Sequence, residues 1–194
     1  MRQKDDKKEQ QIFDATLELV VKSGLAGITM CDISKVAGIA TGTLYIYFKN
    51  KEELINDLFT ICRKESAQFY FNGLQSKDNF ETSFRKIFYN IVEYRKQYFN
   101  KSVFLDQYYH SPYVSEKKRH EATQQLQPFY EVMENGKKQG LAKDYDNLLL
   151  LWYVIGCINE VIKGCHYRKK AIDDLTINNL FTMCWNGLKT SLSP

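Results

Sequence analysis

The sequence predicts an all-α protein of about nine helices, and three observations lead to this fold class. Apolar residues recur with helical spacing along most of the 194 residues. The chain contains only 3 prolines and 10 glycines, which is few for a β protein with many turns. No segment shows a convincing alternation of apolar and polar residues. With 44% apolar residues, a chain of this length can bury a core of its own.

The first fifty residues predict three helices, two of them short. Their expected ranges are 8–22, 30–36 and a third that opens at Thr41 or Thr43 and ends near residue 47. The first is amphipathic and stops at Gly24, because glycine is favoured just after the last turn of a helix. Thr29 is a typical N-cap for the second, and Asp32 suits its positive end. Gly38 breaks the chain between the second and the third.

Six longer helices are predicted in the rest of the chain, and Asn50 is the expected cap of the first of them. Their expected ranges are 51–71, 80–94, 97–110, 116–138, 144–167 and 173–191, with a loop over 73–79. Pro128 lies inside the range 116–138, where a proline either kinks or divides a helix. We therefore predict an N-terminal three-helix domain over 1–50 and a larger helical domain over 51–194.

Composition and missing motifs exclude several classes of protein. No apolar run approaches the roughly 20 residues that span a membrane, and the N-terminus lacks the apolar stretch of a signal peptide, so we expect a cytoplasmic protein with no membrane partner. The five cysteines and three histidines show no ligand spacing, so no metal and no other cofactor is expected. No phosphate-binding loop or nucleophile motif is present, so we assign no catalytic residue and do not expect an enzyme.

Residues 29–48 place two short helices around Gly38, which is the arrangement of a helix-turn-helix motif whose second helix enters the major groove of double-stranded DNA. Hydroxyl, phenol and ammonium groups suit contacts to phosphates and base edges, and a glycine permits close approach. The candidate DNA-binding residues are Thr29, Thr41, Gly42, Thr43, Tyr45, Tyr47, Lys49 and Lys51. The alternative to DNA contact is a place half in the core for Tyr45 and a solvated side chain for Lys49. Arg2, Lys4, Lys7 and Lys8 form a basic arm that either adds DNA contacts or is solvated.

A continuous signature runs from residue 24 to residue 54. It consists of Gly24-Leu25, Thr29-Met30, Ile33, the run Ile39-Ala40-Thr41-Gly42-Thr43-Leu44-Tyr45-Ile46-Tyr47-Phe48, Asn50-Lys51 and Leu54. These residues resemble the signature of the TetR family of bacterial transcriptional regulators. The resemblance implies a homodimer that binds a palindromic operator and a C-terminal domain that binds a small molecule. Cys31 departs from members with arginine there, and residues 30–47 hold no arginine for a bidentate guanine contact.

Aromatic residues are dense in the predicted larger domain. In the family's layout its helices enclose a cavity, which implies a small hydrophobic or aromatic effector. The candidate pocket residues are Phe84, Phe88, Ile91, Phe104, Tyr108, Phe129, Trp152 and Ile155, and core packing is the alternative for each. The last two helices are apolar on more than one face, which favours a four-helix interface with a second copy. The candidate interface residues are Ile158, Ile162, Leu180, Cys184, Trp185 and Leu188.

Together these patterns predict a ligand-responsive DNA-binding transcriptional regulator, specifically a repressor released from its operator by the effector. An activator of the same fold is not separated from a repressor by the sequence. A helical protein-interaction module without specific operator binding is the second hypothesis, because the net charge is only +4 and the two short helices lack arginine.

Overall fold

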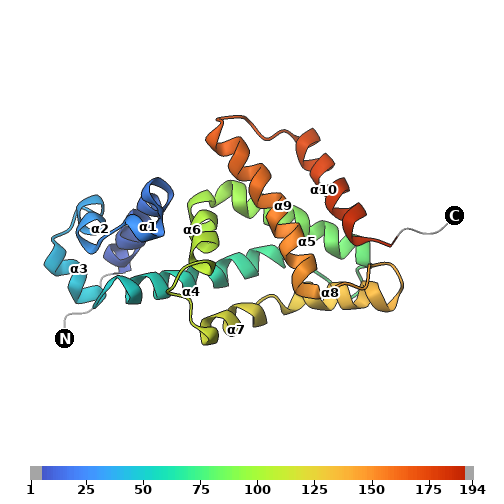
Figure 1. Ribbon diagram of the computed structural model, residues 1–194, viewed down its shortest axis with the longest axis horizontal. Coiled ribbons are helices and arrows are strands. Elements are labelled where there is room, and N and C mark those ends of the chain that lie inside the picture. The colour runs from blue at the N-terminus through green and yellow to red at the C-terminus, as the bar shows by residue number, and fades with distance from the viewer. Residues whose placement is uncertain (1–5, 191–194) are drawn as a thin grey trace. The chain divides into compact units, whose positions relative to one another are not determined.

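A computed structural model describes residues 6–190 of the chain, and over this range it is all-α (Figure 1). The described range contains ten helices: α1 (Asp6–Gly27), α2 (Met30–Val36), α3 (Thr41–Tyr47), α4 (Lys51–Tyr70), α5 (Phe80–Gln97), α6 (Phe99–Tyr109), α7 (Glu116–Gln124), α8 (Gln127–Lys138), α9 (Asn147–Tyr167) and α10 (Asp174–Leu188). The one extended pairing within that range is an isolated antiparallel bridge between Ala142 and Lys189. The predicted fold class is therefore confirmed.

The structure divides the predicted range 116–138 into α7 and α8, which is one of the two outcomes expected at Pro128. Pro128 occupies the first turn of α8. A proline is tolerated there because the first turn of a helix leaves its N–H groups without intrahelical partners, whereas a proline further in would remove a hydrogen bond. This division accounts for ten helices instead of about nine.

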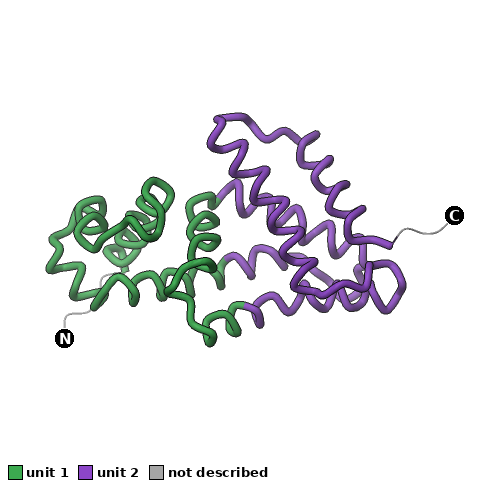
Figure 2. The backbone as a smooth tube through the Cα atoms, viewed as in Figure 1, with its two compact units in different colours: residues 1–65, 98–122 green, residues 66–97, 123–194 purple. Residues whose placement is uncertain are grey.

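The chain forms two compact units (Figure 2). Unit 1 consists of Met1–Glu65 and Tyr98–Ala122, and unit 2 of Ser66–Gln97 and Thr123–Pro194. This division differs from the predicted boundary at residue 50, because the first part of α4, all of α6 and most of α7 belong to unit 1. Leu54 and Leu58 of α4 and Phe104 of α6 join one apolar core with residues of α1, α2 and α3. A three-helix module alone would leave those core residues uncovered.

Unit 1 is closed by contacts between segments that are far apart in the sequence. Phe59 of α4 and Tyr108 of α6 stack with ring centroids 3.9 Å apart, and the Tyr108 hydroxyl donates to Asn56 Oδ1 at 2.6 Å. Burial raises the pKa of Tyr108 to about 12. The stacked pair fixes α6 against α4 inside the same core that carries α1–α3.

α1 is interrupted at Gly24, where the backbone has φ 74° and ψ 156°, so the predicted stop appears as a break inside the helix. The break frees backbone groups that a continuous helix would pair. The side chain of Gln107 on α6 supplies partners: its Oε1 accepts from the N–H of Leu25 at 2.7 Å, and its Nε2 donates to the carbonyl of Val20 at 3.4 Å. α6 therefore stabilises the end of α1.

Unit 2 is built on aromatic packing between α5 and α10. Phe84 lies with its ring centroid 5.7 Å from that of Trp185, and Phe88 lies 5.3 Å from Phe181. Gly136 of α8 allows a close approach, since a Cβ placed there would lie 2.7 Å from the ring of Phe80. These contacts bring α5, α8 and α10 around one core.

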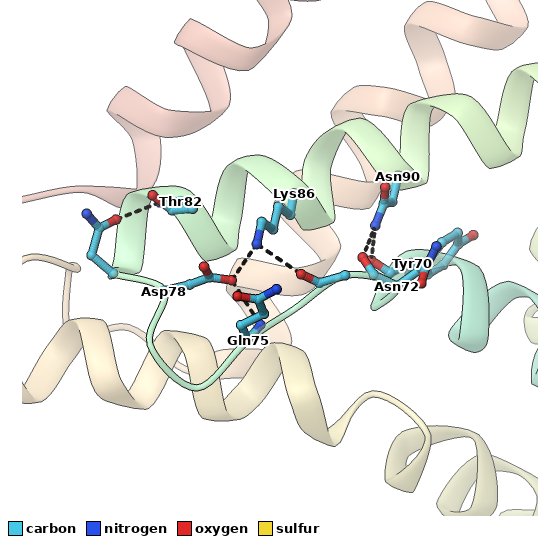
Figure 3. A network of polar contacts seen from close by, with 9 residues as sticks. Tyr70, Asn72, Gln75, Asp78, Thr82, Lys86 and Asn90 are labelled. Atoms are coloured by element: carbon cyan, nitrogen blue, oxygen red, sulfur yellow. Dashed lines mark hydrogen bonds and ion pairs between the residues drawn. The ribbon is translucent and has the colours of Figure 1, made fainter.

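Polar groups fix the loop between α4 and α5 within unit 2 (Figure 3). The Lys86 ammonium donates to the carbonyl of Gly73 at 2.9 Å and pairs with Asp78 at 2.7 Å, and this hydrogen bond lowers the pKa of Asp78. The Asn90 amide donates to the carbonyls of Tyr70 and Asn72 at 3.1 and 2.9 Å. Side chains of α5 thus satisfy carbonyls that the last turn of α4 leaves open.

Candidate nucleic-acid interface

α2 begins with a complete capping box. The Thr29 hydroxyl accepts from the N–H of Asp32 at 3.2 Å, and the Asp32 carboxylate accepts from the N–H of Thr29 at 3.0 Å and from its hydroxyl at 2.6 Å. These hydrogen bonds from Thr29 lower the pKa of Asp32. Thr29 is confirmed as an N-cap. The Thr29 hydroxyl, which was predicted to contact DNA, is bonded to the Asp32 carboxylate and backbone.

The turn that joins α2 to α3 is fixed by backbone geometry and by one pair of hydroxyls. Gly38 has φ 66°, a conformation that glycine adopts without strain. The hydroxyls of Ser34 and Thr41 lie 2.8 Å apart, and Ser34 also bonds the carbonyl of Cys31 at 2.9 Å. A carbonyl only accepts, so the Ser34 proton points to Cys31 and Thr41 donates to Ser34. The hydrogen bond from Thr41 to Ser34 therefore holds α3 against α2.

α3 has one buried face and one exposed face. Leu44 is fully buried and Tyr47 is 8% exposed, and both belong to the core of unit 1. On the opposite side Tyr45 is 52% exposed and Ile46 is 63% exposed. The helical turn of about 100° per residue sets these two side chains on either side of Gly42. The exposed face of α3, defined as Gly42, Tyr45 and Ile46, is the surface that this helix can offer to a partner.

Gly42 has no evident role inside the chain. It lies in a regular helix, and a Cβ at this position would meet no atom of the described residues within 4 Å. Glycine inside a helix costs about 0.5–1 kcal/mol relative to alanine. A partner whose surface comes close to the backbone of α3 gives a physical reason for a glycine here.

Lysines flank this face of α3. Residues 33–51 contain three lysines and no acidic residue. Lys35 and Lys49 are exposed. Lys51 is the first residue of α4, and its ammonium lies 3.4 Å from the carbonyl of Ala26 and 5.7 Å from the centroid of the Tyr113 ring. Lys51 therefore also donates a hydrogen bond to the C-terminal end of α1. An uncharged helix face flanked by lysines matches a groove lined by phosphates.

The structure brings the eight candidate DNA-binding residues into one region but gives them different exposures. Thr43 is half-buried, and no hydrogen bond to its hydroxyl occurs among the described residues. Tyr47 is turned into the core, so DNA contact from its ring would require the core to open. Ile46 was not among the predicted contact residues, although its spacing from Gly42 is a signal in the sequence, because residues four apart share a helix face. Of the predicted basic arm, Arg2 and Lys4 lie outside the described residues.

The predicted pocket residues do not form one group. Phe84, Phe88, Ile91 and Phe129 are buried in unit 2, but Phe104 and Tyr108 lie in the core of unit 1. Trp152 is 63% exposed on α9 and Ile155 is half-buried. Phe104 and Tyr108 therefore belong to a different unit from the other four buried candidates, and the pocket itself stays a prediction. These two rings are needed by the core that carries α1–α4.

The predicted dimer-interface residues mostly face their own chain. Five of them are buried within the single chain, namely Ile158, Ile162, Leu180, Cys184 and Leu188, and Trp185 is half-buried against Phe84. A second copy would not reach the five covered side chains in this conformation, whereas Trp185 stays partly accessible and the interface itself stays a prediction. The exposed large apolar residues of the two helices are instead Leu148, Leu149, Trp152, Tyr153, Tyr167, Leu175 and Met183.

By length and composition alone, α9 could cross a membrane, in contrast to the expectation from the apolar runs of the sequence. Only 28% of its most apolar window is buried in the single chain. Asn159, Glu160 and Lys163 interrupt its second half. Five of its residues are nevertheless buried, namely Leu150, Leu151, Val154, Ile158 and Ile162.

Two family models match separate parts of the chain. The model described as bacterial regulatory proteins, tetR family, matches residues 12–58, which include α2 and α3. The model described as the tetracyclin repressor-like C-terminal domain matches residues 80–189. The second match alone covers more than half of the 194 residues.

Curated relatives match over shorter segments. An uncharacterized HTH-type transcriptional regulator of Bacillus subtilis, YhgD, is 30% identical over 89 residues, which are 46% of this chain and 47% of the relative. The fatty acid metabolism regulator protein of the same organism is 44% identical over 69 residues, 36% of this chain and 34% of that protein. The matched segments thus span less than half the length of these relatives.

Solved structures share the whole fold. A TetR family transcription regulator from Marinobacter aquaeolei superposes with a TM-score of 0.86 at 21% identity, covering 98% of this chain and 100% of that one. A TetR-family regulator from Haemophilus influenzae superposes with a TM-score of 0.74 at 21% identity, covering 97% and 100% of the two chains. Together with the two family models, this likeness establishes that the chain belongs to the TetR family of bacterial regulatory proteins.

Proposed function

We propose that the protein is a DNA-binding transcriptional regulator that inserts α3 into the major groove of its operator. The observation that carries this proposal is the exposed face of α3, whose side chains make no hydrogen bond or ring contact among the described residues and which is flanked by the exposed Lys35 and Lys49, with no acidic residue in the segment 33–51. Helix-turn-helix proteins present their second short helix in this way. The protein would act in the cytoplasm of a bacterial cell, as a regulator and not as an enzyme.

Fluorescence anisotropy with the protein's own promoter region tests this proposal. We expect tight binding that weakens with added salt, and much weaker binding to a scrambled duplex. Lys49→Gln should lower the affinity and reduce the salt slope by about 1, whereas Lys138→Gln, an exposed lysine of unit 2, should change neither. Equal affinity for promoter and scrambled DNA would instead favour the helical protein-interaction module.

We further propose that the protein acts as a homodimer through the exposed apolar face of α9, defined as Leu148, Leu149, Trp152, Tyr153 and Gly156. Exposed apolar patches of this kind mark interaction sites. A Cβ at Gly156 would meet no atom of residues 6–190 within 4 Å, so this helix too carries a glycine with open space beside it. A two-fold dimer would present two α3 helices to a palindromic site. Native mass spectrometry should report the mass of two chains.

A small hydrophobic or aromatic effector is proposed to bind unit 2 and to release the protein from DNA, which makes it a repressor. The C-terminal family model and the buried aromatic residues of α5 support this. Release requires the effector to prefer the state that does not bind DNA, and couplings of about 1–3 kcal/mol are typical. Native mass spectrometry of the purified protein would detect a retained ligand. A reporter gene that is silenced in the absence of the protein would identify an activator instead.

A further inference from the structure

The exposed face of α3 contains no group that makes a bidentate hydrogen bond to a base. The helix reads Thr-Gly-Thr-Leu-Tyr-Ile-Tyr, with no charged or amide side chain. Arginine and lysine recognise guanine through bidentate hydrogen bonds, and asparagine and glutamine recognise adenine in the same way. Direct readout by α3 therefore has to use hydroxyl groups or apolar contacts.

The hydroxyl groups are few. The Thr41 proton is donated to Ser34, and Tyr47 is turned into the core. Thr43 is half-buried and Tyr45 is exposed, so these two remain for polar contacts. Ile46 is 63% exposed, more than the 52% of Tyr45, and its side chain can only make apolar contacts.

The major-groove edges of the bases offer one apolar group, the 5-methyl group of thymine. An isoleucine has no hydrogen-bonding atom, so it gains affinity at a thymine by removing that methyl group from water and gains nothing at the polar edges of other bases. Gly42, on the same face, lets the groove floor come close enough for this contact. A groove that displays thymine methyl groups therefore fits the exposed face of α3.

Building on the proposed DNA-binding function, we propose that Ile46 is a specificity-determining residue that reads thymine methyl groups in each half-site. Ile46 does not belong to the core, so its truncation leaves the fold intact. Lys35 and Lys49 position the helix through phosphates but carry no sequence information. The half-site should accordingly contain thymines at the positions opposite α3.

The test begins with an operator obtained by selection from random duplex DNA with the full-length protein. Each thymine of a half-site is then replaced by deoxyuridine, which lacks only the 5-methyl group. At one or two positions the affinity of the wild-type protein should fall about fourfold per methyl group removed. The Ile46→Ala protein should bind thymine and uracil duplexes equally at those positions. Replacement outside the half-sites should have no effect.

Ile61→Ala is the matched control, because Ile61 is an exposed isoleucine of α4 in the same unit. This variant should discriminate thymine from uracil as the wild type does. If the wild type binds all uracil-substituted operators as tightly as the original, or if Ile46→Ala still discriminates, the inference is wrong while DNA binding stands. If selection yields no preferred sequence, both the proposed function and this inference are wrong.

Discussion

α3 and α9 both expose apolar side chains around a glycine that has open space beside it, but their charges differ. α3 is flanked by Lys35 and Lys49, with no acidic residue over 33–51. α9 carries no charged residue over 147–159, where it presents Leu149 and Trp152. An apolar face framed by lysines fits a groove lined with phosphates, whereas a long uncharged face fits another copy of itself. Charge at the border, and not apolar exposure, separates the two kinds of partner.

The largest effect is expected when a charge is placed in the exposed apolar face of α9. Trp152→Glu should convert the dimer into monomers and lower operator affinity by about 100-fold or more, because a single chain holds one half-site. Sedimentation velocity gives the mass and anisotropy gives the affinity. Gln68→Glu, at an exposed position of α4, should change neither. A Trp152→Glu protein that stays dimeric would show that α9 is not the interface.

Gly42→Ala should lower operator affinity about tenfold, because the added methyl group holds the groove away from α3. The melting temperature should stay the same or rise, since alanine favours a helix by up to about 1 kcal/mol and meets no neighbour here. Anisotropy and thermal unfolding measure the two quantities. Unchanged affinity would show that DNA does not approach this face.

Gly156→Ala is the matched change on α9. It should weaken self-association about threefold to tenfold while stabilising the isolated helix, because the added methyl group would separate the paired copies. Operator affinity, measured well above the dimer dissociation constant, should remain that of the wild type. If Gly156→Ala weakened DNA binding under those conditions, or Gly42→Ala weakened the dimer, the roles assigned to the two faces would be exchanged.

The smallest effects should separate two threonines of α3. Thr41→Val removes the hydrogen bond to Ser34 and should reduce the free energy of unfolding by about 1 kcal/mol, with little change in DNA affinity. Thr43→Val should leave stability unchanged and lower DNA affinity about threefold. Chemical denaturation and anisotropy on the same samples measure both. The reverse pattern would mean that the hydroxyl of Thr41 leaves Ser34 to contact DNA.

Features set by neighbours in the sequence were predicted well. The cap at Thr29 depends on Asp32 three residues later, and the cap at Asn50 on the N–H of Glu53, 2.8 Å from its side-chain oxygen. The positive φ of Gly38 follows from its place between two short helices. Such interactions span a few residues, so a single sequence carries all the information that they need.

Features set by distant partners were not predicted. Tyr108 stacks on Phe59 and so belongs to unit 1, and the end of α1 depends on Gln107, 82 residues from Leu25. α10 is apolar on several faces, so periodicity could not decide which face meets α5 and which stays exposed. In the structure Trp185 packs against Phe84 and Met183 is exposed. The proposed interface therefore uses other residues than the predicted one.

The central claim is that the exposed face of α3 reads the DNA sequence. It is tested most directly by measuring the sequence specificity of a variant that is changed only on this face. Anisotropy titrations would compare the wild type with a Tyr45→Ala, Ile46→Ala double variant on the operator and on a scrambled duplex. We expect the variant to bind both duplexes with the same weak affinity, while its dimer mass and melting temperature match those of the wild type. A variant that still prefers the operator as strongly as the wild type would contradict the claim that this face reads DNA.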